Sequence, residues 1–133
     1  MVSWHLAIAY AELGQPDDAW RCIDDAIDKV EKSNEKCWEP EVNRIAGEVA
    51  LKSPARDTQK AQKHFERALN VARRQQMKSA ELRAAMSLAR LWRDQGKPQQ
   101  ARELLAPVYG WFTEGFDTLD LKEAKALLKD LAS

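Results

Sequence analysis

The sequence predicts an all-α protein, and more narrowly an α-solenoid of three helical hairpins followed by one C-terminal capping helix. Three observations predict this class. Gly and Pro number five each, while Ala, Leu, Lys, Arg, Glu and Gln dominate, as in long helices. Apolar residues recur three and four positions apart, which is the helical spacing. The helical segments repeat in pairs with a period of about forty residues, which is typical of stacked hairpins.

The first predicted hairpin covers residues 2–33. Its first helix ends at Gly14, and Pro16 opens the next helix, because Gly suits a helix C-terminus and Pro suits a first turn. The apolar positions of the first helix are Leu6, Ala7, Tyr10 and Leu13. The second helix carries an apolar stripe on one side and aspartates on the other, which indicates one buried and one solvated face. Its apolar stripe is Ala19, Ile23, Ala26, Ile27 and Val30.

The second predicted hairpin covers residues 38–75. Its first helix begins near Pro40 and ends near Pro54, since the residue before a proline disfavours helix. Asp57 is the predicted cap of the partner helix. The inward positions of the two helices are Val42, Ile45, Ala46 and Val49, then Ala61, Phe65, Ala68, Leu69 and Ala72.

The third predicted hairpin covers residues 79–114, and the capping helix covers residues 118–132. Gly96 separates the two helices of the hairpin. Their inward positions are Leu82, Ala85, Leu88, Ala89 and Trp92, then Ala101, Leu105 and Val108. The capping helix has one leucine-rich side and a charged outer side, as the terminal unit of a solenoid needs.

These hairpins resemble the tetratricopeptide repeat, whose first helix carries a Leu and a small residue, then an aromatic residue, then a closing Gly. The first hairpin matches this pattern at Leu6-Ala7, Tyr10, Gly14, Ala19, Ile23 and Ala26. The third matches at Leu88-Ala89, Trp92, Gly96, Ala101 and Leu105. The second hairpin departs from the pattern, with three extra residues in its turn and no Gly there. The resemblance implies one domain forming a right-handed superhelix, with the first helices lining a concave groove that binds a peptide or partner domain.

A narrower resemblance covers the stretch from Ser79 to Leu121. It is similar to the carboxy-terminal end of large bacterial signalling proteins, which join a nucleotide cyclase or transcription-activator domain to a P-loop ATPase and a tetratricopeptide arm. The resemblance implies a regulatory, cytoplasmic signalling module within a longer parent chain. The sequence contains no P-loop and no cyclase carboxylate pair, so it implies neither activity for this chain.

The candidate partner-binding stripe lies on the first helix of the third hairpin, roughly opposite its core stripe. Its residues are Arg83, Met86, Arg90 and Arg93, three or four positions apart. The matching positions on the earlier hairpins include Trp4, Ile8 and Asn43. With the first helices lining the groove, as the resemblance implies, this surface suits a peptide with an apolar residue and an acidic group, because Arg binds carboxylates with two hydrogen bonds. The alternative is a solvated face whose arginines pair with nearby Glu or Asp.

Other classes of function have little support in the sequence. We find no nucleophile beside a base, and His5 and His64 lack further ligands at metal-site spacing, so we expect no enzyme, no cofactor and no metal. Cys22 and Cys37 are expected to be free thiols. The formal net charge is zero and no aromatic residues alternate with the arginines, which argues against nucleic acid. No apolar run is long enough for a membrane, and no signal sequence follows Met1.

Two hypotheses about function remain. In the first, the chain is a non-catalytic interaction or regulatory module that binds a protein, a peptide or another domain of its own parent chain. In the second, it is a structural or oligomerisation segment without a groove ligand. Trp4, Trp20 and Trp38 gather in the amino-terminal half, and we expect self-association through the first hairpin.

Overall fold

The computed structural model describes residues 4–32, 38–52, 56–115 and 118–132, and the seven elements in these ranges are all α-helices. They are α1 (Trp4–Glu12), α2 (Pro16–Lys32), α3 (Glu39–Lys52), α4 (Thr58–Arg74), α5 (Lys78–Asp94), α6 (Pro98–Gly110) and α7 (Leu119–Leu131). The predicted all-α class is confirmed. Each predicted hairpin range holds one consecutive helix pair, except that α5 begins one residue earlier than expected.

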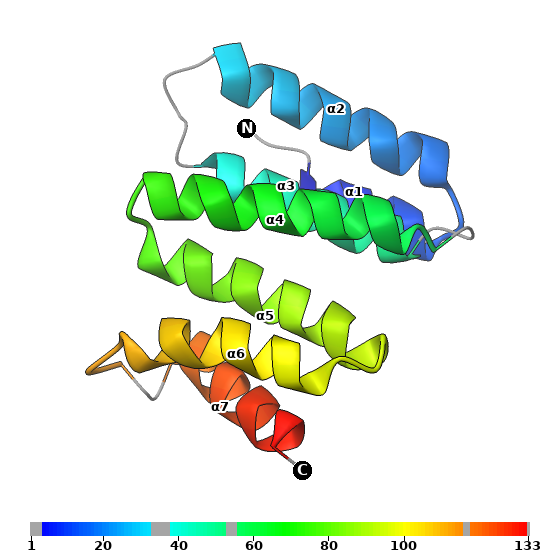
Figure 1. Cartoon of the computed structure of the whole chain (residues 1–133). Coiled ribbons are helices and arrows are strands. Elements are labelled where there is room, and N and C mark those ends of the chain that lie inside the picture. The colour runs from blue at the N-terminus through cyan, green and yellow to red at the C-terminus, as the bar shows by residue number, and fades with distance from the viewer. Residues whose placement is uncertain (1–3, 33–37, 53–55, 116–117, 133) are drawn as a thin grey trace.

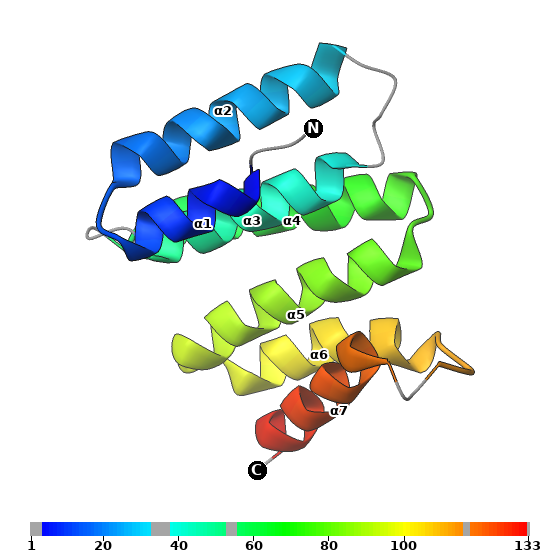
Figure 2. The same ribbon diagram turned by 180° about the vertical axis from the view of Figure 1, so that it is seen from behind.

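The helices form a stack in which each helix contacts its neighbours along the chain. In addition α1 contacts α3, α3 contacts α5, and α5 contacts α7. Within the described residues the backbones of α2, α4 and α6 do not approach one another closely, although side chains of α2 and α4 meet. Figure 1 shows α4 and α6 in front, and the view from behind in Figure 2 brings α1 and α7 to the front. The odd-numbered helices thus form a continuous row, which we call the inner row, and the first hairpin and α7 lie at opposite ends of the stack (Figure 1).

Small residues hold the helices close together. The six alanines that the sequence places at matching positions of the three hairpins all have 0% of their surface exposed. They are Ala7, Ala46 and Ala89 on the first helices, and Ala19, Ala61 and Ala101 on the second helices. An alanine side chain lets two helix backbones approach closely while leaving no void. The sequence repeat therefore corresponds to a repeated packing position.

Helices α3 and α4 approach each other closely where Gly47 faces Phe65. A Cβ atom added at Gly47 would lie 2.4 Å from Cε1 of Phe65, well inside van der Waals contact. Phe65 is completely buried, and its cluster includes Leu88 and Leu91 of α5. One aromatic ring therefore packs the second hairpin against itself and against the third.

Three of the turns end their helices in the same way. Gly14 and Gly96 have φ of 76° and 78°, and Gln76 has φ of 57°, which is left-handed backbone. In the turn after α5, Gly96 N–H donates to Arg93 O at 3.0 Å and Lys97 N–H donates to Trp92 O at 2.8 Å, a Schellman pattern. The two glycines occupy the positions that the sequence predicted. The equivalent role of Gln76, between α4 and α5, was not predicted, because a glutamine gives no signal for left-handed backbone.

The amino-terminal ends of two helices are as expected. Pro16 is the first residue of α2. The carboxylate of Asp57 accepts a hydrogen bond from the N–H of Lys60 at 3.0 Å, which confirms the predicted cap of α4. The predicted features at Cys37 and Pro54 lie outside the described residues. Among the described helices, none combines the length and the apolar character needed to cross a bilayer.

The close approach of Gly47 to Phe65 predicts the effect of adding one methyl group. We expect Gly47→Ala to destabilise the chain by about 1–3 kcal/mol, because the buried ring of Phe65 must move out of a packed site. Gly110→Ala is the matched control, since a Cβ there meets no atom within 4 Å. Thermal unfolding followed by circular dichroism measures both. If the Gly47→Ala variant and the native chain have equal melting temperatures, the Phe65 ring does not restrict the side chain at position 47.

Candidate functional site

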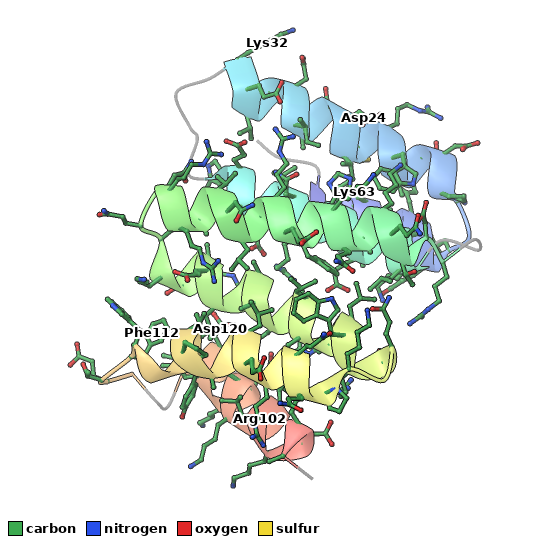
Figure 3. The ribbon with its side chains drawn as sticks, viewed as in Figure 1. Asp24, Lys32, Lys63, Arg102, Phe112 and Asp120 are labelled. Atoms are coloured by element: carbon green, nitrogen blue, oxygen red, sulfur yellow. The ribbon has the colours of Figure 1, made fainter. Side chains whose placement is uncertain are left out.

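The three arginines of the predicted stripe are all paired with carboxylates of the final helix. Arg83 Nη1 lies 3.1 Å from Asp120 Oδ2, and Arg93 Nη1 lies 3.1 Å from Asp130 Oδ2. Arg90 Nη2 lies 3.5 Å from Glu123 Oε2. Since α5 and α7 are neighbours in the inner row, the basic stripe of one helix meets an acidic stripe of the next. Figure 3 labels Asp120, the carboxylate nearest the start of α7.

Glu41 extends this ion-pair network to α3. Arg44 Nη2 donates to Glu41 Oε1 at 2.6 Å, and Arg83 Nε donates to Glu41 Oε2 at 3.3 Å. Arg83 therefore joins α3, α5 and α7. Burial acts to raise the pKa of the Glu41 carboxyl, but the hydrogen bonds and positive charges of Arg44 and Arg83 outweigh it and lower the pKa below its ordinary value. Glu41 is thus a partly buried carboxylate held in its charged form.

The structure does not bring the predicted site residues onto one open surface. Met86 is buried in the core cluster shared by α4, α5, α6 and α7. Asn43 is buried as well, and its Nδ2 donates to the carbonyl oxygen of Glu39 at 3.0 Å. The expectation that these two side chains line an open groove is therefore corrected, because neighbouring helices cover both. Ile8 packs, half-buried, against the cluster of α1, α2 and α3. Trp4 belongs to α1, but its side chain lies outside the described residues.

A second polar cluster lies between α2, α3 and α4. The Nδ1 atom of His64 lies 3.4 Å from Oδ1 of Asn43, a hydrogen bond when the ring carries its proton on Nδ1. The ring centroids of His64 and Trp20 are 5.9 Å apart, and Lys60 Nζ lies 3.7 Å from the Trp20 ring centroid. No local pattern connects Asn43 with His64, because they lie twenty-one positions apart in the chain.

Burial is the main cause that lowers the pKa of His64, and the positive charges of Lys60 and Arg67 lower it further. Asp24 acts in the opposite direction without reversing the shift. His64 is therefore neutral at pH 7. A neutral ring suits the hydrogen bond to Asn43 and the contact with Trp20.

The described residues contain no group of three or more His, Cys, Asp or Glu side chains placed to hold a metal ion. Cys22 is a half-buried free thiol on α2. The largest set of charged groups that the ion pairs described above bring together lies on α3, α5 and α7.

Sequence reasoning missed the carboxylates that complete this row. Glu41, Asp120 and Asp130 lie 42, 37 and 37 residues from the arginines they contact, close to one repeat period. An arginine and a carboxylate about one repeat period apart could therefore have predicted these ion pairs from the sequence. A search for pairs within one helix could not find them, because the contacts join consecutive first helices.

No protein-family model, curated protein or solved structure matches this chain.

The lowered pKa of His64 predicts that the stability of the fold depends on pH. Between the ordinary value of 6.5 and the lower pKa in the folded chain, the unfolded chain binds more protons, so the free energy of unfolding falls as pH decreases below about 6.5. Glu41 contributes in the same direction only below its ordinary value of 4.5. We expect the melting temperature to fall between pH 7.5 and pH 5.5, and to fall less in His64→Gln. His5 is present in both the native chain and the His64→Gln variant, so it cannot cause a difference between them. If the melting temperatures of both depend on pH in the same way, the assignment to His64 is wrong.

Proposed function

We propose that this chain is a non-catalytic protein-binding module of the tetratricopeptide type, a right-handed solenoid that acts as a regulatory part of a longer signalling protein. Its inner row of first helices receives a peptide or a partner domain. The single observation that carries the proposal is the repeated packing: each first helix contacts the next, and alanines at matching positions of the hairpins have no exposed surface. Stacked hairpins of this kind present extended surfaces suited to other proteins.

The arginine row supports a partner with an acidic group. The side chains of Arg83, Arg90 and Arg93 remain between 34% and 40% exposed although all three are paired. Ion pairs at this exposure contribute only about 0.2–1 kcal/mol each, because water already solvates both groups. A partner carboxylate can therefore share or replace the contacts with α7 at little cost. The inner row thus combines a fixed positive stripe with exchangeable negative partners.

Two variants of Arg90 distinguish recognition of a partner from the docking of α7. We expect Arg90→Glu to reduce capture of partners from an extract of the producing cells by about tenfold, because it repels a partner carboxylate and loses a charge-assisted contact. The matched variant is Arg90→Glu combined with Glu123→Arg, which restores the ion pair to α7 with reversed polarity. Quantitative mass spectrometry of the captured proteins measures the effect, and circular dichroism confirms folding.

The two variants distinguish the roles of Arg90. If Arg90 recognises the partner, the doubly substituted chain stays defective although α7 is paired again. If full capture returns in the doubly substituted chain, Arg90 serves only to hold α7 and the groove proposal fails. The groove proposal also fails if the folded Arg90→Glu chain captures partners as well as the native chain does.

A second candidate function, oligomerisation, is favoured by the exposed side of α1. Leu6 and Leu13 are 54% and 71% exposed, although both belong to the apolar stripe of that helix. The positions that match Leu6 on the later hairpins are Ile45 and Leu88, and both are buried in clusters shared with the preceding hairpin. The exposed face of α1 is thus the kind of surface that another helical unit covers elsewhere in this stack. A second copy of the chain is the occupant that we propose.

Sedimentation velocity tests this association directly. We expect the native chain to form dimers as its concentration rises into the hundred-micromolar range, and Leu6→Glu with Leu13→Glu to stay monomeric, because charges on both positions oppose burial. Both leucines are exposed, so the substituted chain retains its core. A native chain that remains monomeric over the whole range would exclude self-association through α1.

A further inference from the structure

A cavity of about 250 Å³ lies at one end of the third hairpin, on a different part of the molecule from the inner arginine row. It is formed by the end of α4, the start of α5 and the second half of α6, and Trp111 closes one side. Figure 1 shows the turn between α4 and α5 and the end of α6 on the same side of the molecule, where Figure 3 labels Phe112. Three separate segments therefore shape this space.

One wall of the cavity carries two cations, and a buried carboxylate holds both in place. The carboxylate of Glu81 has only 8% of its side chain exposed, and it pairs with Arg73 Nε at 3.1 Å and with Lys78 Nζ at 3.3 Å. A guanidinium has five N–H donors and an ammonium has three, so the contacts with Glu81 use a small part of what the two side chains offer. A buried carboxylate thus positions two cations in the wall of the cavity.

The opposite wall is apolar and aromatic. Leu104 and Val108 line it from α6, and Trp111 is 56% exposed. Phe112 holds the Trp111 ring edge to face, with ring centroids 5.2 Å apart and planes at 87°. Lys78 Nζ lies 5.1 Å from the Trp111 ring centroid, a cation–π contact that joins the two walls. A large exposed indole held in place beside a cation is a common binding feature rather than a packing need.

The size and charge of the cavity limit what it accepts. At roughly 30 Å³ per water, its volume equals about eight water molecules, and it is smaller than the roughly 300–1,000 Å³ of sites for drug-sized ligands and cofactors. One amino-acid residue is therefore the appropriate size. Glu103 on the outer rim is exposed and already accepts a hydrogen bond from Gln99 at 3.2 Å, so water and Gln99 moderate its repulsion of an anion.

We propose that this cavity binds the carboxyl-terminal residue of a partner polypeptide whose last side chain is large and apolar. The terminal carboxylate pairs with Arg73 and Lys78, and the apolar side chain lies against Trp111, Leu104 and Val108. The cavity is separate from the inner arginine row, because none of the three arginines of that row lines it.

A pair of peptides tests the proposal in solution. The first is acetyl-Gly-Ser-Phe with a free carboxylate, and the second is the same peptide ended by an amide. Both are titrated into the ¹⁵N-labelled chain, and the indole N–H signal of Trp111 is followed by NMR after assignment with Trp111→Phe. We expect the acid to shift this signal and to bind at least about tenfold more tightly than the amide, since only the acid forms charge-assisted hydrogen bonds.

Substitutions then locate the carboxylate. Arg73→Gln with Lys78→Gln should reduce the affinity for the acid to that for the amide. Trp111→Ala, followed through the backbone N–H signals of the labelled chain, should weaken both peptides. Glu103→Gln should strengthen binding of the acid about twofold, because it removes one of the two carboxylates that line the cavity, the one not paired with Arg73 or Lys78. Arg102→Gln is the matched control, since Arg102 is an exposed cation on α6 that does not line the cavity. The dispersion of the NMR spectrum shows that each variant is folded.

Two outcomes would overturn the proposal. The first is equal affinity for acid and amide, which would mean that the cations play no part. The second is the absence of any shift at Trp111 at millimolar peptide.

Discussion

The contact between Phe65 and Gly47 is the constraint on which the rest of this stack depends. The ring occupies space that any side chain at position 47 would fill, and it is buried beside two leucines of α5. Truncating such a buried aromatic side chain typically costs about 3–5 kcal/mol, a large part of the stability of a domain this size. Because the same ring packs α3, α4 and α5, it sets the position of the third hairpin relative to the second. Both candidate recognition surfaces are built on that third hairpin.

Ion pairs contribute less to the stability of the fold than this packing does, but they form at defined positions. The pairs between α5 and α7 are partly exposed, so each adds little to the free energy of unfolding. Their regular arrangement instead favours one register of α7, in which leucines and an alanine pack inward while acidic residues meet arginines. Arg83 differs from the other two arginines because it also reaches the partly buried Glu41. It therefore links three consecutive helices of the inner row in a way that a purely surface ion pair does not.

The third hairpin, together with Arg73 at the end of α4, carries two sets of cations with different surroundings. On the inner row, each arginine faces carboxylates from another helix and remains open to exchange. At the cavity beside Trp111, a single buried carboxylate holds two cations against an apolar wall. The first arrangement suits a broad charged surface of a partner, and the second suits one residue with a defined end. A chain with zero net charge can therefore hold two local sites for negative groups, since opposite charges elsewhere balance them.

The sequence by itself determined the helices and the small residues between them. Helical periodicity, Gly14, Gly96 and the capping Asp57 depend on interactions within a few residues, so local patterns located them well. The tertiary structure decided which charged and polar groups meet. Asn43 and Met86 occupied the predicted stripe by spacing alone, but the burial of each is set by neighbouring helices that spacing within one helix cannot reveal. The pairing of Arg83 with Glu41 and Asp120, and the cavity beside Trp111, likewise arise from segments far apart in the chain, brought together by the stacking of hairpins.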